Sequence, residues 1–426
     1  MTVAIFLGSL LIAMAIGIPI AYSLLISGIA LMWHLDLFDA QILAQNVING
    51  ADSFPLLAVP FFMLAGEIMN AGGLSKRIVN FAMTLVGHVK GGLGYVGIMA
   101  AIIMAALSGS AVADAAALAA LLLPMMNRAG YDPARSAGLL SAASIIAPII
   151  PPSIGFVVFG VAANVSVSKL FMAGIAPGIM LGAALWFTWW WLVRKEKITA
   201  PPRASKAEVL AAFKDATFAL VLPVIVVVGL KFGVFTPTEA AVVAAVYAIM
   251  ISTLVYRELK FSDLYGLFLA ASKTTAVIMF LVAAAMVSAW LITVANIPAE
   301  VAKMMEPFMG NKMLLMVILM LLVIVVGTAL DFTPTVLILT PVLMPLVKQA
   351  GIDPVYFGVM FIMNNAIGLI TPPVGTVLNV VCGVARINMD TAFKGVMPFL
   401  LAQLAVLFLL VAFPSLVIVP MKWMLS

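Results

Sequence analysis

The chain has 426 residues, of which 65% are hydrophobic and only 9% are Asp, Glu, Lys or Arg. A soluble domain carries roughly 25% charged residues, so this composition excludes a water-soluble protein and favours a bundle of membrane-spanning helices. The formal net charge is +5, and the single cysteine, Cys382, excludes an internal disulfide and a cysteine-based metal cluster.

The first part of the chain predicts three spans, at about 2–16, 18–33 and 55–69, with a polar stretch at 36–53. The N-terminus has neither a basic region nor a cleavage site, so we expect a first span and not a removed signal peptide. Residues 74–90 predict an interfacial amphipathic helix, because apolar side chains recur on one helical face. These side chains are Leu74, Ile78, Phe81, Leu85 and Val89.

Two apolar stretches follow, 91–107 and 111–127, and the polar sequence Ser-Gly-Ser at 108–110 separates them. Each stretch is shorter than an ordinary span, and basic residues flank the pair at Lys90 and Arg128. We interpret the pair as a re-entrant hairpin that leaves the membrane on the side it entered. Two ordinary short spans are the alternative.

A helix that starts at Asp132-Pro133 is expected to run to about residue 147, because Asp suits the cap and Pro the first helical position. The helix must then unwind, since three prolines remove backbone N–H groups, and Ser153 can begin a second half-helix. These prolines are Pro148, Pro151 and Pro152.

The next crossing is expected at 170–193, and the most basic loop of the chain follows it at 194–216. By the positive-inside rule this loop is cytoplasmic. Its basic residues are Arg194, Lys195, Lys197, Arg203, Lys206 and Lys214.

The second half repeats this plan, with spans at 217–230, 239–255 and 272–295 and an amphipathic helix at 297–309. The turn before the second of these spans reads as a capping box between Thr236 and Glu239.

A second hairpin is predicted around the polar tip 327–334. Its first arm, 313–326, reaches about 21 Å and is too short for the roughly 30 Å membrane core, and its second arm ends near Lys348. A helix broken around 371–373 and a last span at 396–419 complete the chain.

A constant offset relates the two halves. Residues 124–177 and 345–398 align without a gap when one stretch is shifted by 221 positions (372 − 151), so that Pro151-Pro152 falls on Pro372-Pro373. Each half then contains five crossings and one hairpin, and because five is odd, the halves enter the membrane from opposite faces. The sequence therefore predicts an all-α polytopic membrane protein of two inverted-topology repeats, 1–215 and 216–426, with both termini outside.

Irregular backbone at membrane depth is tolerated only around a cavity, because lipid cannot satisfy it. Four such places are predicted, at 108–110, 148–153, 327–334 and 365–375. Exposed carbonyls and hydroxyls there suit Na⁺, and the N-termini of half-helices suit an anionic ligand.

Asp331 is the most isolated acid of the chain. It is interpreted as a cation ligand or proton carrier, or as the N-cap of the following half-helix, and the two roles are compatible. Asp114, one turn past Ser110, is either functional or makes a structural hydrogen bond. Asn365 and Thr371 are candidate carbonyl and hydroxyl ligands at the second break.

Several other polar residues have more modest interpretations. Glu239 is expected to cap a helix, and Glu67 and Lys273 lie in spans where they are either functional or bond between helices. Asn379 can hydrogen-bond a polar substrate, and Arg386 is interpreted as a loop charge. The two histidines, His34 and His88, lie in separate regions and no phosphate-binding loop exists, so nothing in the sequence supports an enzyme or direct use of ATP.

Five motifs carry a family resemblance. They are Leu107-Ser108-Gly109-Ser110 with Ala113-Asp114, Pro148-x-x-Pro151-Pro152-Ser153, Gly233-x-Phe235-Thr236-Pro237-Thr238-Glu239-Ala240, Gly327-x-x-Leu330-Asp331-x-x-Pro334 and Gly368-x-x-Thr371-Pro372-Pro373-Val374-Gly375. Together they resemble the large membrane subunit (DctM type) of a tripartite ATP-independent periplasmic (TRAP) transporter, over essentially the whole chain. Residues 44–60 and 372–383 also resemble subunits assigned to 2,3-diketo-L-gulonate, a sugar acid.

The resemblance implies Na⁺-coupled uptake of an organic acid across the bacterial inner membrane, with Na⁺ as the coupling ion and no other cofactor. It implies two protein partners, a periplasmic substrate-binding protein and a small four-helix membrane subunit. It also implies an elevator mechanism, in which transport elements move against a scaffold. The expected transport elements are 91–165 and 312–386, the scaffold spans are 1–90, 170–193, 217–295 and 396–419, and the connecting arms are 74–90 and 297–309.

The same resemblance implies where the ligands bind. The first Na⁺ site is expected at Ser108, Gly109, Ser110, Asp114, Pro148, Pro151 and Ser153. The second is expected at Gly327, Asp331, Thr333, Asn365, Thr371 and Gly375. The substrate is expected at Ser110, Ser153, Thr376 and Asn379.

The nearest alternative is a stand-alone Na⁺- or H⁺-coupled carrier of dicarboxylates or other organic anions, which strict dependence on a binding protein would exclude. A proton-conducting subunit of a respiratory complex is more remote, because the chain lacks a file of Lys, His and Glu across the mid-membrane. Paired hairpins that enter from opposite faces argue for alternating access and against a channel.

Overall fold

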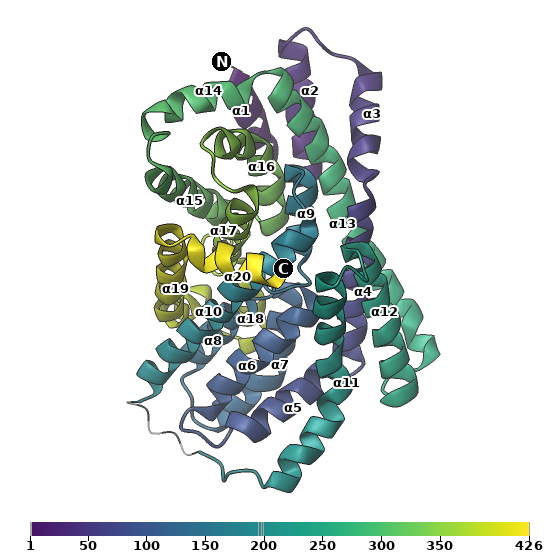
Figure 1. The fold of residues 1–426 in the computed structure, drawn as a ribbon, viewed down its shortest axis with the longest axis vertical. Coiled ribbons are helices and arrows are strands. Elements are labelled where there is room, and N and C mark those ends of the chain that lie inside the picture. The colour runs from purple at the N-terminus through teal and green to yellow at the C-terminus, as the bar shows by residue number, and fades with distance from the viewer. Residues whose placement is uncertain (1, 195, 197, 199, 426) are drawn as a thin grey trace.

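The computed structural model describes residues 2–194, 196, 198 and 200–425, and this part of the chain is helical throughout, with turns and short loops between helices. Figure 1 shows the helices gathered in one elongated bundle, with the N-terminus near its upper end. By length and composition, nine helices among the described residues could cross a membrane, and six shorter apolar helices accompany them. A multi-span membrane protein is therefore confirmed.

The elements of the first repeat are α1 (Thr2–Ala15), α2 (Ile20–His34), α3 (Ala40–Ala51), the 3₁₀ turn η1 (Phe54–Leu57), α4 (Ala58–Ala71), α5 (Leu74–Val86), α6 (Gly92–Ser108), α7 (Ala111–Arg128), α8 (Pro133–Ser144), α9 (Ile154–Ala163) and α10 (Val167–Val193).

The elements of the second repeat are α11 (Lys206–Lys231), α12 (Pro237–Met250), the π-helical turn η2 (Ile251–Val255), α13 (Phe261–Val294), α14 (Ile297–Met305), the 3₁₀ turn η3 (Glu306–Phe308), α15 (Lys312–Ala329), α16 (Phe332–Gln349), α17 (Pro354–Gly368), α18 (Thr376–Ala385), α19 (Met389–Ala412) and α20 (Ser415–Leu425).

The 221-residue offset holds for the element boundaries as well as for the sequence. Helix α7 spans 111–128 and α16 spans 332–349, so both ends differ by 221 (332 − 111 and 349 − 128). The cis peptide bonds Pro151–Pro152 and Pro372–Pro373 differ by the same number. The offset also pairs α3, η1 and α4 (40–71) with the single helix α13 (261–294). The duplication therefore extends upstream of the stretch where sequence alone shows it.

The two repeats have inverted topology. Figure 1 shows the hairpin of α6 and α7 in the lower half of the molecule, beside α5, and the hairpin of α15 and α16 in the upper half, below α14. Each hairpin returns to the side from which it entered, because its two arms pack against each other and a sharp polar turn joins them. The re-entrant hairpins predicted from the Ser-Gly-Ser tip and from the tip at 327–334 are confirmed.

Several boundaries differ from the prediction. The polar stretch 36–53 contains a helix, α3, because the Asp39 side chain caps it by accepting hydrogen bonds from the backbone N–H groups of Gln41 and Ile42. Helix α11 begins at Lys206, inside the predicted loop, where Ser205 and Glu208 form a capping box. Both helices start in polar sequence that hydropathy does not mark as helical.

Three helices of the second repeat are also longer or displaced. Helix α13 starts at Phe261, 11 residues before the predicted start at 272, and α15 has 18 residues, so it spans about 27 Å and not 21 Å. The last span starts at Met389, before the predicted start at 396. Hydropathy missed its first turns because they contain Asp390 and neighbouring polar residues. The span ends at Ala412 before Pro414, and α20 follows as a separate helix.

Helix α5, the first predicted arm, is amphipathic, but its buried face is rotated from the predicted one. Leu74 and Ile78 are fully buried, whereas Leu85 and Val89 are 38% and 42% exposed. The buried side continues through Val79 and Ala82, because α5 packs between α6 and α11.

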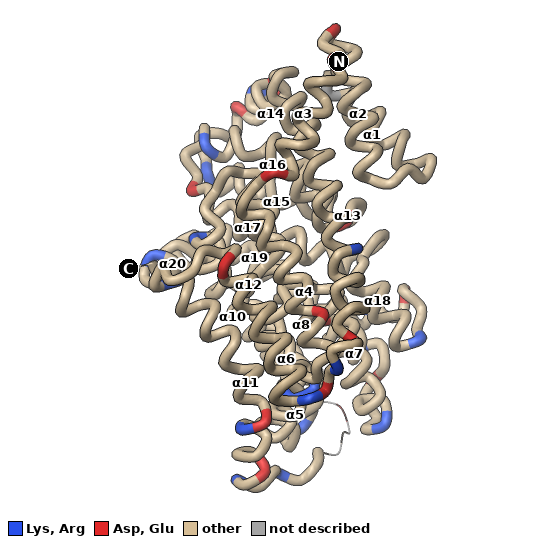
Figure 2. The backbone as a smooth tube through the Cα atoms, turned by 90° about the vertical axis from the view of Figure 1, so that its right-hand side faces the viewer, with Lys and Arg blue, Asp and Glu red and all other residues tan. Residues whose placement is uncertain are grey.

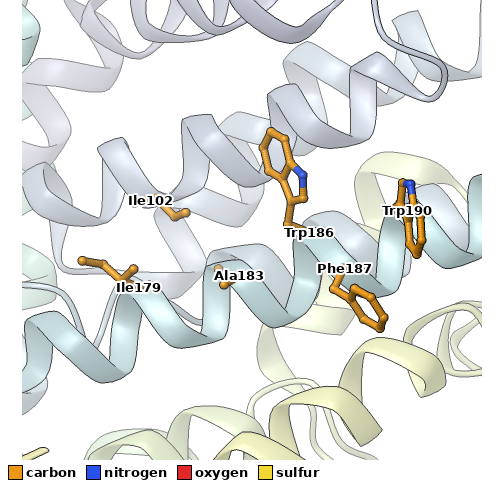
Figure 3. Close-up of a pocket in the computed structure, with 7 residues that line it drawn as sticks. Ile102, Ile179, Ala183, Trp186, Phe187 and Trp190 are labelled. Atoms are coloured by element: carbon orange, nitrogen blue, oxygen red, sulfur yellow. The ribbon is translucent and has the colours of Figure 1, made fainter. Parts of the chain in front are cut away.

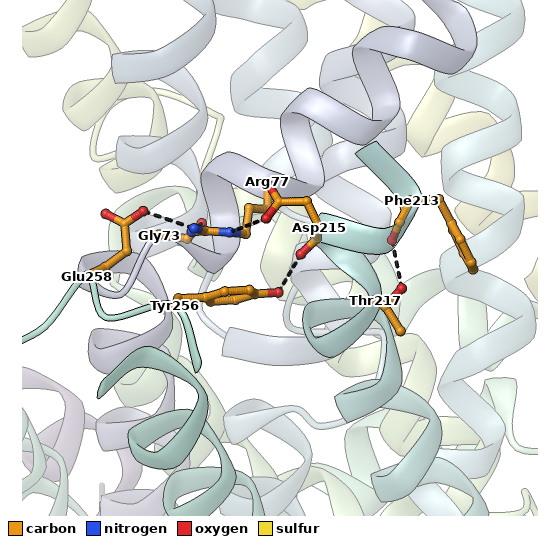
Figure 4. Close-up of polar contacts among 7 residues, drawn as sticks. All are labelled: Gly73, Arg77, Phe213, Asp215, Thr217, Tyr256 and Glu258. Carbon is orange, nitrogen blue, oxygen red and sulfur yellow. Dashed lines mark hydrogen bonds and ion pairs between the residues drawn. The ribbon is translucent and has the colours of Figure 1, made fainter. Parts of the chain in front are cut away.

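Arg77 of α5 joins this arm to the second repeat. Its guanidinium donates to Asp215 at 3.1 Å and to Glu258 at 3.0 Å, and it lies over the ring of Tyr256 at 3.7 Å (Figure 4). A third donor reaches the carbonyl oxygen of Gly73 at 3.1 Å. Burial raises the pKa of Tyr256 to about 12, so its hydroxyl remains a donor, and it donates to the backbone oxygen of Asp215 at 2.6 Å. We call this set of residues the Arg77 clamp.

Helices α10 and α19 pack with the hairpins and the broken helices. The indole N–H of the fully buried Trp189, in α10, donates to Gly91 at the start of the first hairpin at 2.9 Å. Gln403, in α19, donates to the Ala142 carbonyl of α8 at 2.8 Å. An added Cβ at Gly395 would lie 2.0 Å from the Ala134 carbonyl oxygen, so α8 and α19 meet backbone to backbone.

Figure 2 shows many of the Lys and Arg residues around α5 and the lower end of α11, and few charges on the helices between the two ends. This distribution fits a bundle whose middle lies in lipid.

Candidate functional site

The first hairpin tip fits closely against the first broken helix. Gly109, between α6 and α7, has φ +61°, a conformation that favours glycine. A Cβ at this position would lie 2.4 Å from the backbone oxygen of Pro152, so no larger residue fits without moving the break. Ser110 follows as the N-cap of α7, and its hydroxyl accepts from the N–H of Ala113 at 3.4 Å.

A buried acid lies behind this tip. Asp114 is 0% exposed, and its Oδ1 accepts a hydrogen bond from the Ser108 hydroxyl at 2.6 Å. The Ser108 hydroxyl in turn accepts from the N–H of Ser110 at 3.2 Å. Among the described residues, Asp114 Oδ2 has no partner at all. A buried carboxylate oxygen without a partner is costly, so this atom is suited to hold a cation or a proton.

The first break uses its own polar groups to close its backbone. The chain turns between Ile145 and Pro152, and Ser153 caps α9. The Ser153 hydroxyl donates to the Pro148 carbonyl at 2.5 Å and accepts from the N–H of Phe156 at 3.2 Å. Because both functions of this hydroxyl are used, Ser153 is a structural cap in this structure, and a ligand would share its oxygen.

The second hairpin tip is joined to the second broken helix by direct bonds. Asp331 occupies the N-cap position of α16, but its side chain forms no cap. Instead, Asp331 Oδ1 accepts a hydrogen bond from the Thr376 hydroxyl, at the start of α18, at 3.2 Å. The N–H of Val374 donates to the Thr328 carbonyl at 3.2 Å. Asp331 therefore has the N-cap position predicted for it, but its side chain makes no capping hydrogen bond, and its carboxylate faces the break.

A buried amide lies beneath this contact. Asn365, in the last turns of α17, is 1% exposed and donates from Nδ2 to the Phe332 carbonyl at 2.7 Å. Its Oδ1 has no partner among the described residues. A Cβ at Gly327 would lie 3.3 Å from this Oδ1, and one at Gly368 would lie 2.5 Å from the Gly327 carbonyl oxygen. Gly327 and Gly368 thus allow backbone carbonyls to lie close to the unpaired amide oxygen of Asn365.

The other predicted residues of this region lie nearby with different contacts. Thr333 is in the first turn of α16, and its hydroxyl makes no hydrogen bond with the described residues. The Thr371 hydroxyl donates to the Ile367 carbonyl at 2.9 Å. Gly375 precedes α18 with φ +46°. Asn379 is exposed, and its Nδ2 donates to the Val374 carbonyl at 2.8 Å.

The two tips approach a common centre. A Cβ at Gly155, in the first turn of α9, would lie 2.7 Å from the ring of Phe332, the first residue of α16. Helix α16 packs against α9, and α7 packs against α18, so each hairpin contacts the broken helix of the other repeat. Sequence patterns did not single out Phe332, Gly155 or Thr328, because their contacts join segments that are distant in the sequence.

The helix ends give this centre a mixed electrostatic character. The C-termini of α6 and α15 end at the tips and carry partial negative charge, which favours a cation. The N-termini of α7, α9, α16 and α18 begin at the tips and breaks and favour an anion. The arrangement can hold cations and an organic anion in neighbouring places.

The two tips are not chemically equivalent. In the 221-residue register, Ser110 corresponds to Asp331, and Asp114 corresponds to Thr335 (335 − 114). The first tip therefore has a buried acid one turn inside its helix, whereas the second has an exposed acid at its end.

An apolar groove lies elsewhere. It has a volume of about 570 Å³ and runs between α6 and α10, lined by Ile102, Ile179, Gly182, Ala183, Trp186, Phe187 and Trp190 (Figure 3). Its lining is apolar, and none of these residues belongs to the tips or breaks. We interpret it as a lipid-facing surface and not as the site.

Two of the four remaining polar residues, Glu239 and Arg386, have the roles predicted for them. The predicted interhelical bonds of the other two, Glu67 and Lys273, are not found among the described residues. Glu239 completes a capping box with Thr236, and Arg386 follows the end of α18 with φ +55°. Neither Glu67 nor Lys273 forms an interhelical hydrogen bond or ion pair with the described residues. No group of three or more His, Cys, Asp or Glu side chains that could hold a metal occurs in the described part of the chain.

Comparison with known proteins gives consistent results. Residues 7–416 match the family described as the DctM component of the tripartite ATP-independent periplasmic transporter. The chain is 58% identical to the 2,3-diketo-L-gulonate TRAP transporter large permease protein YiaN of Escherichia coli (strain K12), over 99% of this chain and 100% of that protein. It is 36% identical to the isethionate TRAP transporter permease protein DctMQ of Oleidesulfovibrio alaskensis, over 94% of this chain and 64% of that protein.

A solved structure shares the fold. The crystal structure of the Alcanivorax borkumensis YdaH transporter superposes with a TM-score of 0.62 over 92% of this chain and 91% of that one, at 15% sequence identity. At this identity the similarity concerns the arrangement of helices alone.

Proposed function

This chain belongs to the DctM family of tripartite ATP-independent periplasmic transporters and is a large permease subunit, and on this premise we propose that it imports a sugar acid together with Na⁺. The acid is handed over by a periplasmic binding protein, and a small four-helix membrane subunit works beside the large permease. The identity of 58% to a permease named for 2,3-diketo-L-gulonate supports a sugar acid as the substrate. The isethionate permease, of which this chain covers 64%, is long enough to include a further portion, as expected for a fused small subunit.

The second hairpin tip is the observation on which the proposal depends most. Asp331 offers a carboxylate oxygen bonded only to Thr376, and Asn365 offers a buried amide oxygen without a partner. Oxygen atoms of this kind, together with the carbonyls at the end of a half-helix, are the ligands that transporters use for Na⁺. We assign the second Na⁺ site to these two side chains and the Gly327 carbonyl, with Thr333, Thr371 and Gly375 as further candidate ligands.

The first Na⁺ site is assigned to the first tip by the same reasoning. Asp114 Oδ2 is the unpaired oxygen, and the Ser108 hydroxyl holds the other carboxylate oxygen in place. The backbone at Gly109 and in the Pro148–Ser153 break supplies candidate carbonyl ligands near Ser110.

The geometry of α18 supports coupling between Na⁺ and an anionic substrate. Thr376 and Asn379 lie on the first turn of this helix, where its dipole favours an anion, but the Asp331 carboxylate lies 3.2 Å from Thr376. A substrate carboxylate at this place would be repelled by Asp331. A Na⁺ ion bound to Asp331 neutralises this repulsion, so the ion and the acid bind together.

We further propose an elevator motion. The moving body contains α6–α10 and α15–α19, and the scaffold contains α1–α4 and α11–α13. The arms α5 and α14 connect the two bodies. This division places α10 and α19, which the sequence suggested as scaffold spans, in the moving body, because Trp189 and Gln403 bond to the first hairpin and to α8. In the bacterial inner membrane, both termini are periplasmic and the 194–216 loop is cytoplasmic.

The test is uptake of a radiolabelled sugar acid by proteoliposomes that contain this chain and its small subunit, with the binding protein outside and an imposed Na⁺ gradient. Two pairs of variants make it specific. Asp331→Asn is compared with Asp390→Asn, an exposed acid in the first turn of α19. Ser110→Ala is compared with Ser166→Ala, because both hydroxyls cap a helix through a 3.4 Å bond and both changes lose about 1 kcal/mol of capping.

We expect uptake to require both Na⁺ and the binding protein, and to be lost in Asp331→Asn and Ser110→Ala but kept in their controls. Na⁺-driven uptake without any binding protein would instead identify a stand-alone carrier. Uptake that needs no Na⁺, with Asp331→Asn active, would refute the assigned cation sites.

A further inference from the structure

The apolar groove between α6 and α10 ends at an arginine. Four of the side chains that line it recur every three or four residues and so lie along one face of α10 (Figure 3). They are Ile179, Ala183, Trp186 and Trp190. The guanidinium of Arg194 lies over the ring of the last of these, 3.7 Å from its centroid. The groove therefore has a cation at one end and apolar side chains along its length.

No carboxylate neutralises this end of the groove in the part of the chain that the structure describes. Arg194 is exposed, and its guanidinium forms neither a hydrogen bond nor an ion pair with any described residue. Lys90 is also exposed and lies beside it, because its ammonium donates to the Arg194 carbonyl at 2.9 Å. The acid nearest to Arg194 in the sequence, Glu196, is already paired with Arg135. Two neighbouring positive charges thus lack a counter-ion, which a bound anion would supply.

The aromatic residues of the groove favour an anion that carries an apolar chain. Trp186 and Trp190 are 38% and 39% exposed, and their indole N–H groups donate to no described residue. Half-exposed tryptophans of this kind lie at the level of lipid headgroups, where the ring contacts the chain and the N–H donates to a polar atom. From Ile179 to Trp190 the groove covers 11 residues (190 − 179), or about 17 Å. This length is close to one leaflet of the roughly 30 Å hydrocarbon core.

Another protein helix suits this groove less well. Helices in membranes associate through small residues, because these allow the backbones to approach closely. Here the small residue Gly182 is already covered by α6, since an added Cβ would lie 2.5 Å from the Cδ1 of Ile102. Phe187, which also lines the groove, is 61% exposed. Such bulky side chains hold a second backbone away, whereas a flexible acyl chain can follow the uneven surface between them.

We propose that this groove binds one anionic phospholipid, with an acyl chain along the face of α10 and the phosphate held by Arg194 and Lys90. Basic pockets between membrane helices bind such headgroups. A zwitterionic phospholipid suits the site less well, because the two cations would repel its own ammonium group. None of the lining residues belongs to the hairpin tips or the broken helices, so the inference is independent of the proposed substrate and ion sites.

The test is native mass spectrometry of the purified full chain in detergent, titrated with phosphatidylglycerol or with phosphatidylcholine of the same acyl chains. Arg194→Gln removes the charge at the groove. Arg128→Gln is the matched control, because Arg128 is an exposed arginine in the last turn of α7 that also lacks an ion pair with the described residues. We expect the wild type and the control to bind the first phosphatidylglycerol about fivefold more tightly than Arg194→Gln, the factor that one basic residue contributes near an anionic headgroup.

Filling the groove tests its apolar part without changing the charge. Ala183→Phe places a ring among the lining side chains of α10. Ala405→Phe is the control, because this alanine is likewise exposed on a long apolar helix, α19, but does not line the groove. We expect Ala183→Phe to weaken the binding of both lipids and Ala405→Phe to weaken neither.

Three results would overturn the proposal. Equal loss of phosphatidylglycerol in Arg194→Gln and Arg128→Gln would indicate unspecific attraction to a basic surface, and equal affinity of the wild type for the two lipids would exclude an anionic site. A lipid-free dimer that Ala183→Phe dissociates would assign the groove to a second copy of this chain. The four substitutions lie at exposed positions, and the charged and apolar parts are tested separately. Misfolding of one variant, seen in its thermal unfolding, therefore leaves the other pair decisive.

Discussion

Replacement of Arg77 is the sharpest test of how the first arm is fixed. Arg77→Met keeps most of the buried stem but removes the guanidinium from Asp215, Glu258 and the Tyr256 ring. We expect the variant to unfold more easily and the α5 arm to detach from α11 and from the loop before α13.

The magnitude follows from the exposure of the partners. The Arg77 side chain is 14% exposed, but Asp215 and Glu258 are 53% and 42% exposed, so each ion pair contributes only about 0.2–1 kcal/mol. The contact over Tyr256 adds about 1 kcal/mol, and the bond to the Gly73 carbonyl adds about 1 kcal/mol. The free energy of unfolding should therefore fall by about 2–4 kcal/mol. Both carboxylates can be hydrated after the change, so no larger penalty arises.

Thermal unfolding of the purified protein in detergent measures this effect. The control is Lys76→Met, at the next residue of the same helix, which is exposed and lacks a partner in the described part of the chain. We expect a midpoint several degrees lower for Arg77→Met and no shift for the control, with the difference shrinking in ~1 M KCl because salt screens the half-exposed pairs. An Arg77→Met midpoint equal to that of Lys76→Met would refute the reasoning.

Three further predictions concern the tips and the moving body. Gly395→Ala should destabilise the protein by about 2 kcal/mol or more, because its Cβ would lie 2.0 Å from a backbone oxygen. Gly266→Ala, at a helical position with open space around it, should instead stabilise the protein by up to about 1 kcal/mol. Thermal unfolding measures both changes. Gly109→Ala should abolish uptake while the protein still inserts into the membrane. The φ of +61° and the 2.4 Å distance from an added Cβ to the Pro152 backbone oxygen together disfavour any side chain. A transport assay measures the loss of uptake, and an expression assay measures insertion. Asp114→Asn should raise the Na⁺ concentration for half-maximal uptake by about tenfold or more, and an unchanged Na⁺ dependence would contradict the first site.

The fold was predictable because its main signals are local. Prolines and glycines mark the hairpin tips and breaks, and the 221-residue offset relates the halves without any knowledge of contacts. The family suggested by the five motifs is confirmed by the match over residues 7–416. Boundaries failed where a helix begins in polar sequence, as in α3 and α11, because hydropathy reports burial in lipid and not helix formation.

The site was only partly predictable, for a similar reason. The Ser108–Asp114 bond joins residues six positions apart, so the sequence could place them at one tip. The bonds of Asp331 to Thr376 and of Asn365 to the Phe332 carbonyl join residues 45 and 33 positions apart. These contacts depend on how a hairpin docks on a broken helix, and no local pattern specifies that docking. Thr333 and Thr371 carry suitable oxygens, but their hydroxyls are not directed to the tip by any bond in the structure.

The constant offset between the repeats also bears on the ancestry of the chain. Before duplication, a polypeptide of one repeat would have inserted into the membrane in both orientations, and two oppositely oriented copies would have associated about a two-fold axis. The packing of α7 on α18 and of α9 on α16, which now lies within one chain, would then have been the interface of that ancient dimer. Fusion freed each copy to change independently. The acid at position 114 of one copy and at position 331 of the other records that divergence, and the two proposed ion sites would be related by descent but no longer interchangeable.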